Sequence, residues 1–217
     1  MTQLTHAVLW DMDGTLIDSH EYHWQAWRET MAAVDRPITF DQFTATFGWR
    51  NDTILRAFYG FDLPPGEVDR IGGVKEERYR ELVRARGIDL LPGAGRWLDR
   101  LKAAGWRQAV ASSAPRANID AILNALKLDH FFDALVSAED VQRGKPDPQV
   151  FLTAAERVGV PPPRCVVVED APAGIEGAHR AGMRAIGVLT THADLPGDRV
   201  VHTLDQLDDG AFDELVR

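Results

Sequence analysis

The spacing of apolar residues divides the chain into a first strand, a long helical segment and a regular alternation of strands and helices. A short apolar run over residues 7–10 has the length and flanks of a buried strand. Apolar residues then recur at intervals of three and four from residue 18 to residue 87, which predicts helices with no strand between them. Two long helices are expected, one through residues 24–34 that ends at Pro37 and one through residues 68–83, with shorter helices over 40–47 and 53–58.

Strands and helices alternate from residue 94 to the end of the chain. Helices are predicted over residues 94–104, 116–127, 149–158 and 173–181, and the strands that follow them over 108–111, 134–136, 165–168 and 184–188. An edge strand is expected at Val200 and Val201, and a closing helix over 204–216. This alternation is typical of a parallel sheet with crossover helices. The sequence therefore predicts an α/β fold, with a Rossmann-like parallel-sheet core of residues 1–17 and 88–217 and an inserted all-helical cap domain of residues 18–87.

Polar side chains follow three of the apolar runs directly. They are Asp11 and Asp13, Ser112 and Ser113, and Glu169 and Asp170. In an open parallel sheet the binding crevice lies beyond the carboxyl ends of the strands. We therefore expect these side chains to form one site.

Asp11 and Asp13 are separated by one residue, so their side chains leave an extended backbone on the same side. Gly14 permits a sharp turn behind them. Two like charges so close together resist ionisation unless a cation compensates them, and a hard divalent ion is the usual compensation. An isolated pair of this kind is also typical of an ordinary strand end with solvated acids. The residues that follow, Gly-Thr-Leu-Ile-Asp, make the motif far more specific.

Ser112 and Lys145 are candidates for binding an anion. The Ser112 hydroxyl and the free backbone N–H groups of a helix that starts near Pro115 would bind a phosphate, although a plain helix cap is an alternative. Lys145 lies in the sequence Gly-Lys-Pro-Asp-Pro ahead of a helix, where a surface lysine in a turn is the alternative.

These motifs resemble those of the haloacid dehalogenase superfamily. The D-x-D-G-T sequence at residues 11–15 is similar to its opening motif, the lysine loop at 144–148 to its third motif and residues 166–178 to its fourth, metal-binding motif. In the phosphatases of that superfamily the first aspartate is the nucleophile and the second is the acid and base. The resemblance implies that Asp11 is the nucleophile, that Asp13 is the general acid and base, and that Ser112 and Lys145 hold the phosphoryl oxygens.

The resemblance also implies a magnesium site made of Asp11, Asp170 and the backbone carbonyl of Asp13, with Glu169 as a direct ligand or as a partner of the ligands. The charges of the site support a metal independently. Four carboxylates against the Lys145 ammonium leave a net charge of −3, which would repel a phosphate dianion. One divalent cation and one proton on Asp13 bring the charge to zero. Oxygen ligands without a His/Cys spacing favour Mg²⁺ over zinc.

The helical insertion is similar to the cap of the beta-phosphoglucomutase-like branch of that superfamily. His23 matches a cap histidine of that branch, and Lys75 with Tyr79 matches a cap lysine and tyrosine one helical turn apart. The sequence Gly-Trp-Arg-Asn at residues 48–51 resembles its substrate-specificity loop, although Trp49 departs from the small residue expected in a sugar phosphomutase.

This resemblance implies substrate contacts from the cap and from the core. The implied substrate-binding residues are His23, Arg50, Lys75, Ser113 and Gly14. A partly buried helix histidine with a structural role is the alternative interpretation of His23.

The expected function is that of a magnesium-dependent phosphomonoester hydrolase, acting on a small sugar or polyol phosphate through an aspartyl-phosphate intermediate. One alternative is a beta-phosphoglucomutase-type mutase, which returns the phosphoryl group to a sugar. Another is a phosphate-receiver signalling module, although receivers are shorter and lack both a helical cap and an equivalent of Asp13. A metal-independent dehalogenase is the third alternative, and it has no use for Asp13 or for Glu169 and Asp170.

Composition limits the partners. The chain has 217 residues and a net charge of −9, which argues against a nucleic acid or an anionic membrane as a partner and leaves a small phosphorylated metabolite. The single cysteine, Cys165, lies in an apolar run and is expected to pack as a small hydrophobic residue in a reducing compartment. The first six residues lack the features of a signal peptide, and no apolar run approaches the roughly 18 residues of a membrane helix. We expect a cytoplasmic monomer.

Overall fold

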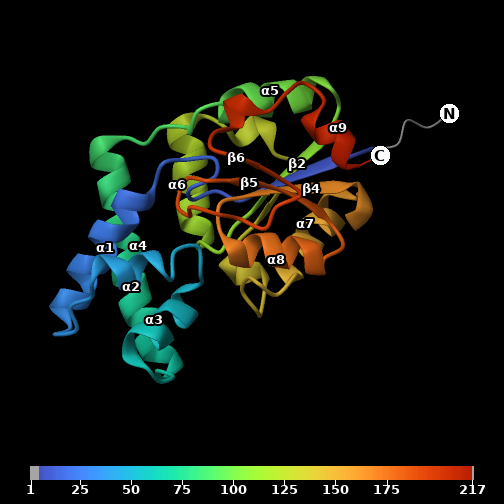
Figure 1. Ribbon diagram of the computed structural model, residues 1–217. Helices are drawn as coiled ribbons and strands as arrows, with labels where there is room; N and C mark the ends of the chain where they lie inside the picture. Colours follow the sequence, from blue (N-terminus) through green and yellow to red (C-terminus); the bar gives the residue numbers. More distant parts are fainter. Residues whose placement is uncertain (1–4, 217) are drawn as a thin grey trace.

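The structure is a computed structural model that describes residues 5–216, and its centre is a six-stranded sheet (Figure 1). All neighbouring strands are parallel, in the order β3-β2-β1-β4-β5-β6. The strands are β1 (Ala7–Trp10), β2 (Arg107–Ala111), β3 (Ala134–Val136), β4 (Cys165–Glu169), β5 (Arg184–Val188) and β6 (Arg199–Val201). The α/β fold predicted from the alternation of strands and helices is confirmed.

The register of the three central strands brings their polar ends to one level. Trp10, the last residue of β1, is paired with Val110 of β2 and with Val168 of β4. The chain continues the pairing by one residue, because the Asp11 backbone N–H donates to the Val168 carbonyl at 3.0 Å. The side chains that follow β1, β2 and β4 therefore meet at the same edge of the sheet.

Helices cover both faces of the sheet, as a parallel sheet requires. On one face α5 (Ala94–Ala103), α6 (Arg116–Leu126) and α9 (Ala211–Leu215) contribute to an apolar core with the strands. On the other face α7 (Gln149–Val158) and α8 (Pro172–Arg180) form a second core with the alternate strand residues (Figure 1). The four 3-10 turns are Asp129–Phe131, Ala138–Asp140, Pro162–Arg164 and Leu204–Gln206. Cys165 is fully buried in the second core, beneath α7 and α8, as expected.

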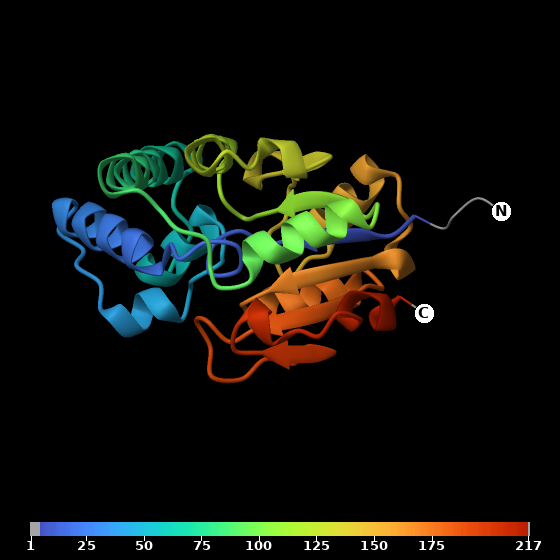
Figure 2. The same cartoon turned by 90° about the horizontal axis from the view of Figure 1, so that it is seen from above.

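Four helices between β1 and α5 form a lobe at one end of the sheet (Figure 2). They are α1 (His20–Ala33), α2 (Phe40–Thr44), α3 (Asn51–Tyr59) and α4 (Pro65–Arg86). These helices have an apolar cluster of their own, which includes Trp27, Phe43 and Ile71. Other cap residues, namely Ala26, Tyr79, Leu82 and Val83, belong to the core cluster of the sheet. The division into a core of residues 1–17 and 88–217 and a cap of residues 18–87 stays a prediction. Residues 1–4 and 217 of the proposed core lie outside the described part of the chain.

The predicted helix over residues 204–216 is wrong, because the chain there forms a 3-10 turn and the short helix α9. The Leu204 carbonyl accepts a hydrogen bond from the Trp97 indole N–H at 2.9 Å. The Asp208 carboxylate accepts one from the Gly210 backbone N–H at 3.0 Å. These contacts replace the hydrogen bonds of a continuous helix. The first cap helix ends at Ala33, ahead of Pro37, and begins at His20, four residues before the predicted start. Helix α2 ends three residues before the predicted end, and α4 extends three residues beyond the prediction at each end. Several boundaries in the core differ from the predicted ones by one residue.

No helix within residues 5–216 combines the length and the apolar character that a membrane span requires.

Candidate active site

Asp11 and Lys145 form the buried centre of the site. The Lys145 ammonium donates to Asp11 Oδ1 at 2.5 Å and to Glu169 Oε1 at 2.6 Å. Asp11 is 6% exposed, Lys145 8% and Glu169 1%, so Lys145 is not the surface lysine in a turn that was its alternative interpretation. Charges buried this deeply are tolerated only when they are paired and hydrogen-bonded. The loop between β3 and α7 thus delivers its lysine to the ends of β1 and β4.

Both oxygens of Glu169 are occupied by the protein itself. Oε1 accepts from Lys145, and Oε2 accepts the backbone N–H groups of Asp170 and Ala171, each at 2.8 Å. Gly174 of α8 passes so close that a Cβ atom there would lie 1.9 Å from Oε1. The sequence left open whether Glu169 is a direct metal ligand or a partner of the ligands. These contacts favour the second role.

Asp11, Glu169 and Asp170 form a buried acidic triad whose candidate ligand oxygens all lie within 4.8 Å of one another. Asp170 is held by the Thr191 hydroxyl at 2.5 Å and by the Thr15 hydroxyl at 3.5 Å. Gly14 has a φ of +82°, and a Cβ atom there would lie 2.2 Å from Asp170 Oδ2. Only a glycine at that position allows the turn after β1 to approach Asp170.

The triad suits a hard divalent cation. Burial raises the pKa of Asp11 to about 8, with the charge of Glu169 acting in the same direction and that of Lys145 opposing it. Burial and the charges of Glu169 and Asp11 also raise the pKa of Asp170 well above its usual range. One lysine does not compensate three carboxylates in this environment. A divalent cation would keep them ionised, and carboxylate oxygens are the ligands that Mg²⁺ prefers.

The raised pKa values predict how the stability of the metal-free protein depends on pH. A carboxyl group with a higher pKa in the folded state than in the unfolded state loses stabilisation as the pH rises between the two values. For Asp11 this interval runs from 3.8 to about 8, and Asp170 acts in the same direction. Asp13, whose folded pKa is about 2, is ionised in both states above about pH 5 and adds no slope there.

We therefore expect the Tm in chelator, followed by scanning calorimetry, to fall between about pH 5 and about pH 8. Added Mg²⁺ should raise the Tm more at the higher pH, because it binds the ionised carboxylates. The Asp11→Asn variant serves as the control, and its Tm should depend less on pH. A Tm in chelator that rises over this interval would contradict the buried triad.

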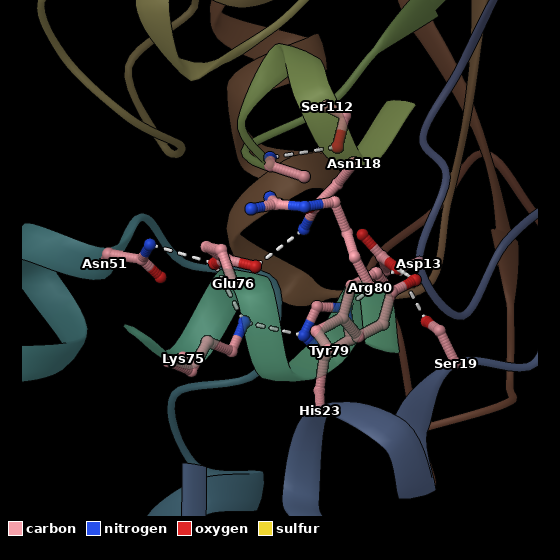
Figure 3. Close-up of polar contacts among 11 residues, drawn as sticks. Asp13, Ser19, His23, Asn51, Lys75, Glu76, Tyr79, Arg80, Ser112 and Asn118 are labelled. Carbon is pink, nitrogen blue, oxygen red and sulfur yellow. Dashed lines mark hydrogen bonds and ion pairs between the residues drawn. The ribbon is translucent and has the colours of Figure 1, made fainter. Parts of the chain in front are cut away.

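Asp13 faces the cap instead of the triad. Its Oδ1 accepts hydrogen bonds from the Ser19 hydroxyl at 2.6 Å and the Tyr79 hydroxyl at 3.3 Å, and lies 3.0 Å from His23 Nε2 (Figure 3). Burial alone would raise the pKa of Asp13. The positive charge of the His23–Lys75 pair and the hydrogen bonds from His23 and Ser19 outweigh burial and lower it to about 2. Asp13 is therefore a carboxylate at neutral pH, and a metal contact through its backbone carbonyl stays a prediction.

A chain of polar contacts continues from Asp13 into the cap. His23 Nδ1 lies 2.8 Å from Lys75 Nζ, and the imidazole ring stacks on Tyr79 with centroids 4.0 Å apart. An ammonium group has no lone pair, so it donates to Nδ1 and the ring proton is on Nε2, where it donates to Asp13. His23 thus orients Asp13, which is more than the structural role that was its alternative interpretation.

Ser112 and Ser113 lie opposite the cap at the end of β2. Ser112 is 1% exposed, and its Oγ accepts a hydrogen bond from the Ala114 backbone N–H at 3.0 Å. Pro115, and not Ser112, is the N-cap of α6. Ser112 is therefore not the plain helix cap that was its alternative interpretation.

Most of the predicted catalytic and substrate-binding residues surround one cavity of about 40 Å³ between cap and core. Its predicted lining residues are Asp11, Asp13, His23, Lys75, Ser112 and Ser113. Arg50 instead borders an adjoining outer groove and donates from Nη1 to the backbone carbonyls of Ala138 at 3.0 Å and Val141 at 2.7 Å. Arg50 thus links the cap to the core.

The sequence did not single out several residues that the structure places in the site. Glu76 and Asn51 line the cavity, and Asn118 of α6 contacts Glu76 (Figure 3). Thr15 and Thr191 contact Asp170. Thr15 lies within the D-x-D-G-T motif and Asn51 within the loop at residues 48–51, which could have indicated them. The other three carry no local signal, because their positions depend on how distant segments pack.

Comparison with known proteins agrees with this geometry. The model of the haloacid dehalogenase-like hydrolase family matches residues 5–182, so the chain belongs to that family. Within the family it belongs to the beta-phosphoglucomutase/CbbY branch, as its similarity to beta-phosphoglucomutase and to CbbY shows. It is 34% identical to beta-phosphoglucomutase of Bacillus subtilis, over 93% of this chain and 91% of that protein. It is 35% identical to fructose-1-phosphate phosphatase YqaB of Escherichia coli, over 84% of this chain and 95% of that protein. The crystal structure of CbbY from Rhodobacter sphaeroides in complex with phosphate has a TM-score of 0.87 at 28% identity and covers 97% of this chain and 100% of that one.

Proposed function

We propose that this protein is a magnesium-dependent phosphatase that hydrolyses a small sugar or polyol phosphate through an aspartyl phosphate on Asp11. The observation that carries the proposal is the shared cavity, where Asp11 and Asp13 meet Ser112 directly above the buried triad. Asp11 and Asp13 have different surroundings, as the separate roles of a nucleophile and of a general acid and base require. Asp11 is held by Lys145 in the core, whereas Asp13 is held by residues of the cap.

Asp11 attacks the phosphorus atom, and the bond to the leaving oxygen breaks as the aspartyl phosphate forms. Lys145 and Ser112 hold the phosphoryl oxygens during this step, which is mainly a matter of position and charge. Asp11 and Asp170 would hold Mg²⁺, with Glu169 fixing Lys145 and the loop after β4. The ion would supply the remaining positive charge that the phosphoryl group needs.

Asp13 transfers the protons. In the first step a protonated Asp13 gives its proton to the leaving oxygen, and in the second step the resulting carboxylate takes a proton from the attacking water. The neighbours of Asp13 lower its pKa to about 2, which favours the carboxylate, the form required for the second step. A phosphoryl dianion bound beside it raises this pKa, because a nearby negative charge disfavours ionisation.

The direct test is release of phosphate from a panel of sugar and polyol monophosphates. We expect turnover with Mg²⁺, none after exhaustive chelation, and recovery with Mg²⁺ but not with Ca²⁺, because Ca²⁺ favours a looser and higher coordination. Full activity in chelator would contradict the proposal.

A mutase is the second candidate, favoured by the small cavity between cap and core and by the similarity to beta-phosphoglucomutase. A mutase must keep water away from the aspartyl phosphate while a bisphosphate intermediate reorients. Trp49 lines the cavity and fills space in which a sugar would have to turn. This ring favours hydrolysis.

One assay separates the two candidates. β-Glucose 1-phosphate is supplied with a trace of glucose 1,6-bisphosphate, and both glucose 6-phosphate and free phosphate are followed. We expect free phosphate to be the main product. Glucose 6-phosphate formed much faster than phosphate would establish the mutase instead.

A further inference from the structure

Glu76 is a buried carboxylate for which the proposed chemistry has no role. It lies on α4 beside Lys75, is 5% exposed and borders both the catalytic cavity and the outer groove. A negative charge at this position faces any part of a substrate that extends from the cavity into the groove. Such a group must be held ionised by its neighbours or be neutralised.

Three donors from three helices hold this charge (Figure 3). Glu76 Oε1 accepts from Lys75 Nζ and from Asn51 Nδ2 of α3, each at 2.9 Å. Glu76 Oε2 accepts from Asn118 Nδ2 of α6 at 2.6 Å. Burial opposes ionisation, but the positive charge of Lys75 and the hydrogen bonds from Lys75 and Asn118 lower the pKa of Glu76. A fixed carboxylate therefore stands where the cavity meets the groove.

The lysine and arginine side chains that line the described cavity and groove are all committed to protein partners. Lys75 donates to His23 and Glu76 and faces the Trp27 ring at 5.2 Å. Arg50 holds two backbone carbonyls of the core. Arg80 donates to Asn118 Oδ1 at 2.8 Å and to Glu77 at 2.6 Å. These contacts already offset much of the positive charge of the three side chains and fix their direction, which disfavours them as partners of a second anionic group.

The outer groove, about 570 Å³ in volume, carries an excess of negative charge. Its charged lining residues are Asp52, Asp69, Glu76 and Glu139 against Arg50 and Arg80. A second phosphate or a carboxylate on the substrate would face this excess, and like charges at close range are strongly disfavoured in a partly enclosed site. A hydroxyl group would not be repelled. Oε2 accepts one hydrogen bond here, and a carboxylate oxygen can accept two.

We propose that Glu76 determines substrate specificity: the site takes a monophosphate whose far end is uncharged and hydroxylated, and rejects one with a second anionic group. The inference rests on the proposed function, since it places the phosphoryl group at Asp11. The inference adds that the end of the substrate away from the phosphoryl group must carry no second anionic group, which the catalytic motifs do not determine. Discrimination of this kind combines an attractive contact with a repulsive one.

The test compares substrates that differ only at the far end. The first pair is fructose 1-phosphate and fructose 1,6-bisphosphate, and the second is glycerol 3-phosphate and 3-phosphoglycerate. Binding to the Asp11→Asn protein with Mg²⁺ is measured by calorimetry, so the result does not depend on turnover. In at least one pair, we expect the compound whose far end is uncharged to bind about tenfold more tightly than its partner, or better. Glu76→Gln should reduce that preference by about tenfold.

Glu81→Gln on the same helix is the matched control, because this carboxylate is 52% exposed and pairs with Arg78. It should leave the preference unchanged. The inference is contradicted if, in both pairs, the compound with a second anionic group binds the Asp11→Asn protein as tightly as its partner or more tightly. It is also contradicted if Glu76→Gln leaves the preference intact, or if neither compound with an uncharged far end binds. The preference of the Asp11→Asn protein itself decides the matter if the Glu76 variant does not fold. A failure of the wild-type protein to release phosphate would instead contradict the proposed function.

Discussion

Asp11→Asn is expected to lower kcat by about 10⁴-fold or more and to abolish the phosphorylated enzyme intermediate. The amide is not a nucleophile, yet it has the shape of the carboxylate and still offers an oxygen to Lys145, which lies 2.5 Å from Asp11 Oδ1. The fold should therefore survive while the chemistry is lost. Phosphate release measures the first effect, and intact-protein mass spectrometry after rapid acid quenching measures the second.

Asp13→Asn is the matched control for that variant. It removes the proton carrier but leaves the nucleophile, so both steps should slow while some phosphorylated enzyme still forms. A phosphoryl group located on any residue other than Asp11 would overturn the proposed mechanism.

The core of the fold could be predicted from the sequence because its signals are local. A buried parallel strand is a continuous apolar run, and its polar end marks the edge where the site forms. Residues 165–168 show this clearly, since they run along β4 and end at Glu169. The long cap helix α4 was accessible in part, because Ile71, Tyr79 and Leu82 of its apolar pattern are buried, whereas Val74 is 54% exposed.

Glu76 could not be predicted because its burial depends on distant segments. It lies in a stretch of α4 dense in charged residues, a composition typical of a solvated helix face. Its partners Asn51 and Asn118 are 25 and 42 positions away in the sequence. No local pattern distinguishes Glu76 from the exposed Glu77 beside it.

Arg50 shows a second limit. The specificity loop was placed near the substrate by resemblance, and Trp49 does line the cavity. The arginine beside it extends to the carbonyls of Ala138 and Val141, and a Cβ atom on Gly144 would lie 2.7 Å from its Cδ. The direction of a long side chain follows from the packing of cap on core, which a motif does not encode.

Lys145→Met is expected to reduce the free energy of unfolding by about 3–5 kcal/mol, the usual cost of removing one partner from a buried ion pair. Asp11 and Glu169 would be left at 6% and 1% exposure without their cation. Urea denaturation in chelator measures the effect, because Mg²⁺ would otherwise bind the freed carboxylates. Lys102→Met is the control, since Lys102 is exposed, and its cost should stay within about 0.5 kcal/mol.

The pH dependence identifies the cause of that loss. The charge of Lys145 lowers the pKa of Asp11, so its removal raises a pKa that is already about 8 and widens the interval over which stability falls with rising pH. The two proteins share the fall between about pH 5 and about pH 7, so the cost of Lys145→Met should grow as the pH rises through about 8 and above it. At that higher pH, adding Asp11→Asn to the Lys145→Met protein should recover part of the lost stability, because it removes one of the two unpaired carboxylates. A cost that is independent of pH and unaffected by Asp11→Asn would mean that Lys145 does not stabilise the fold through its pairing with the carboxylates.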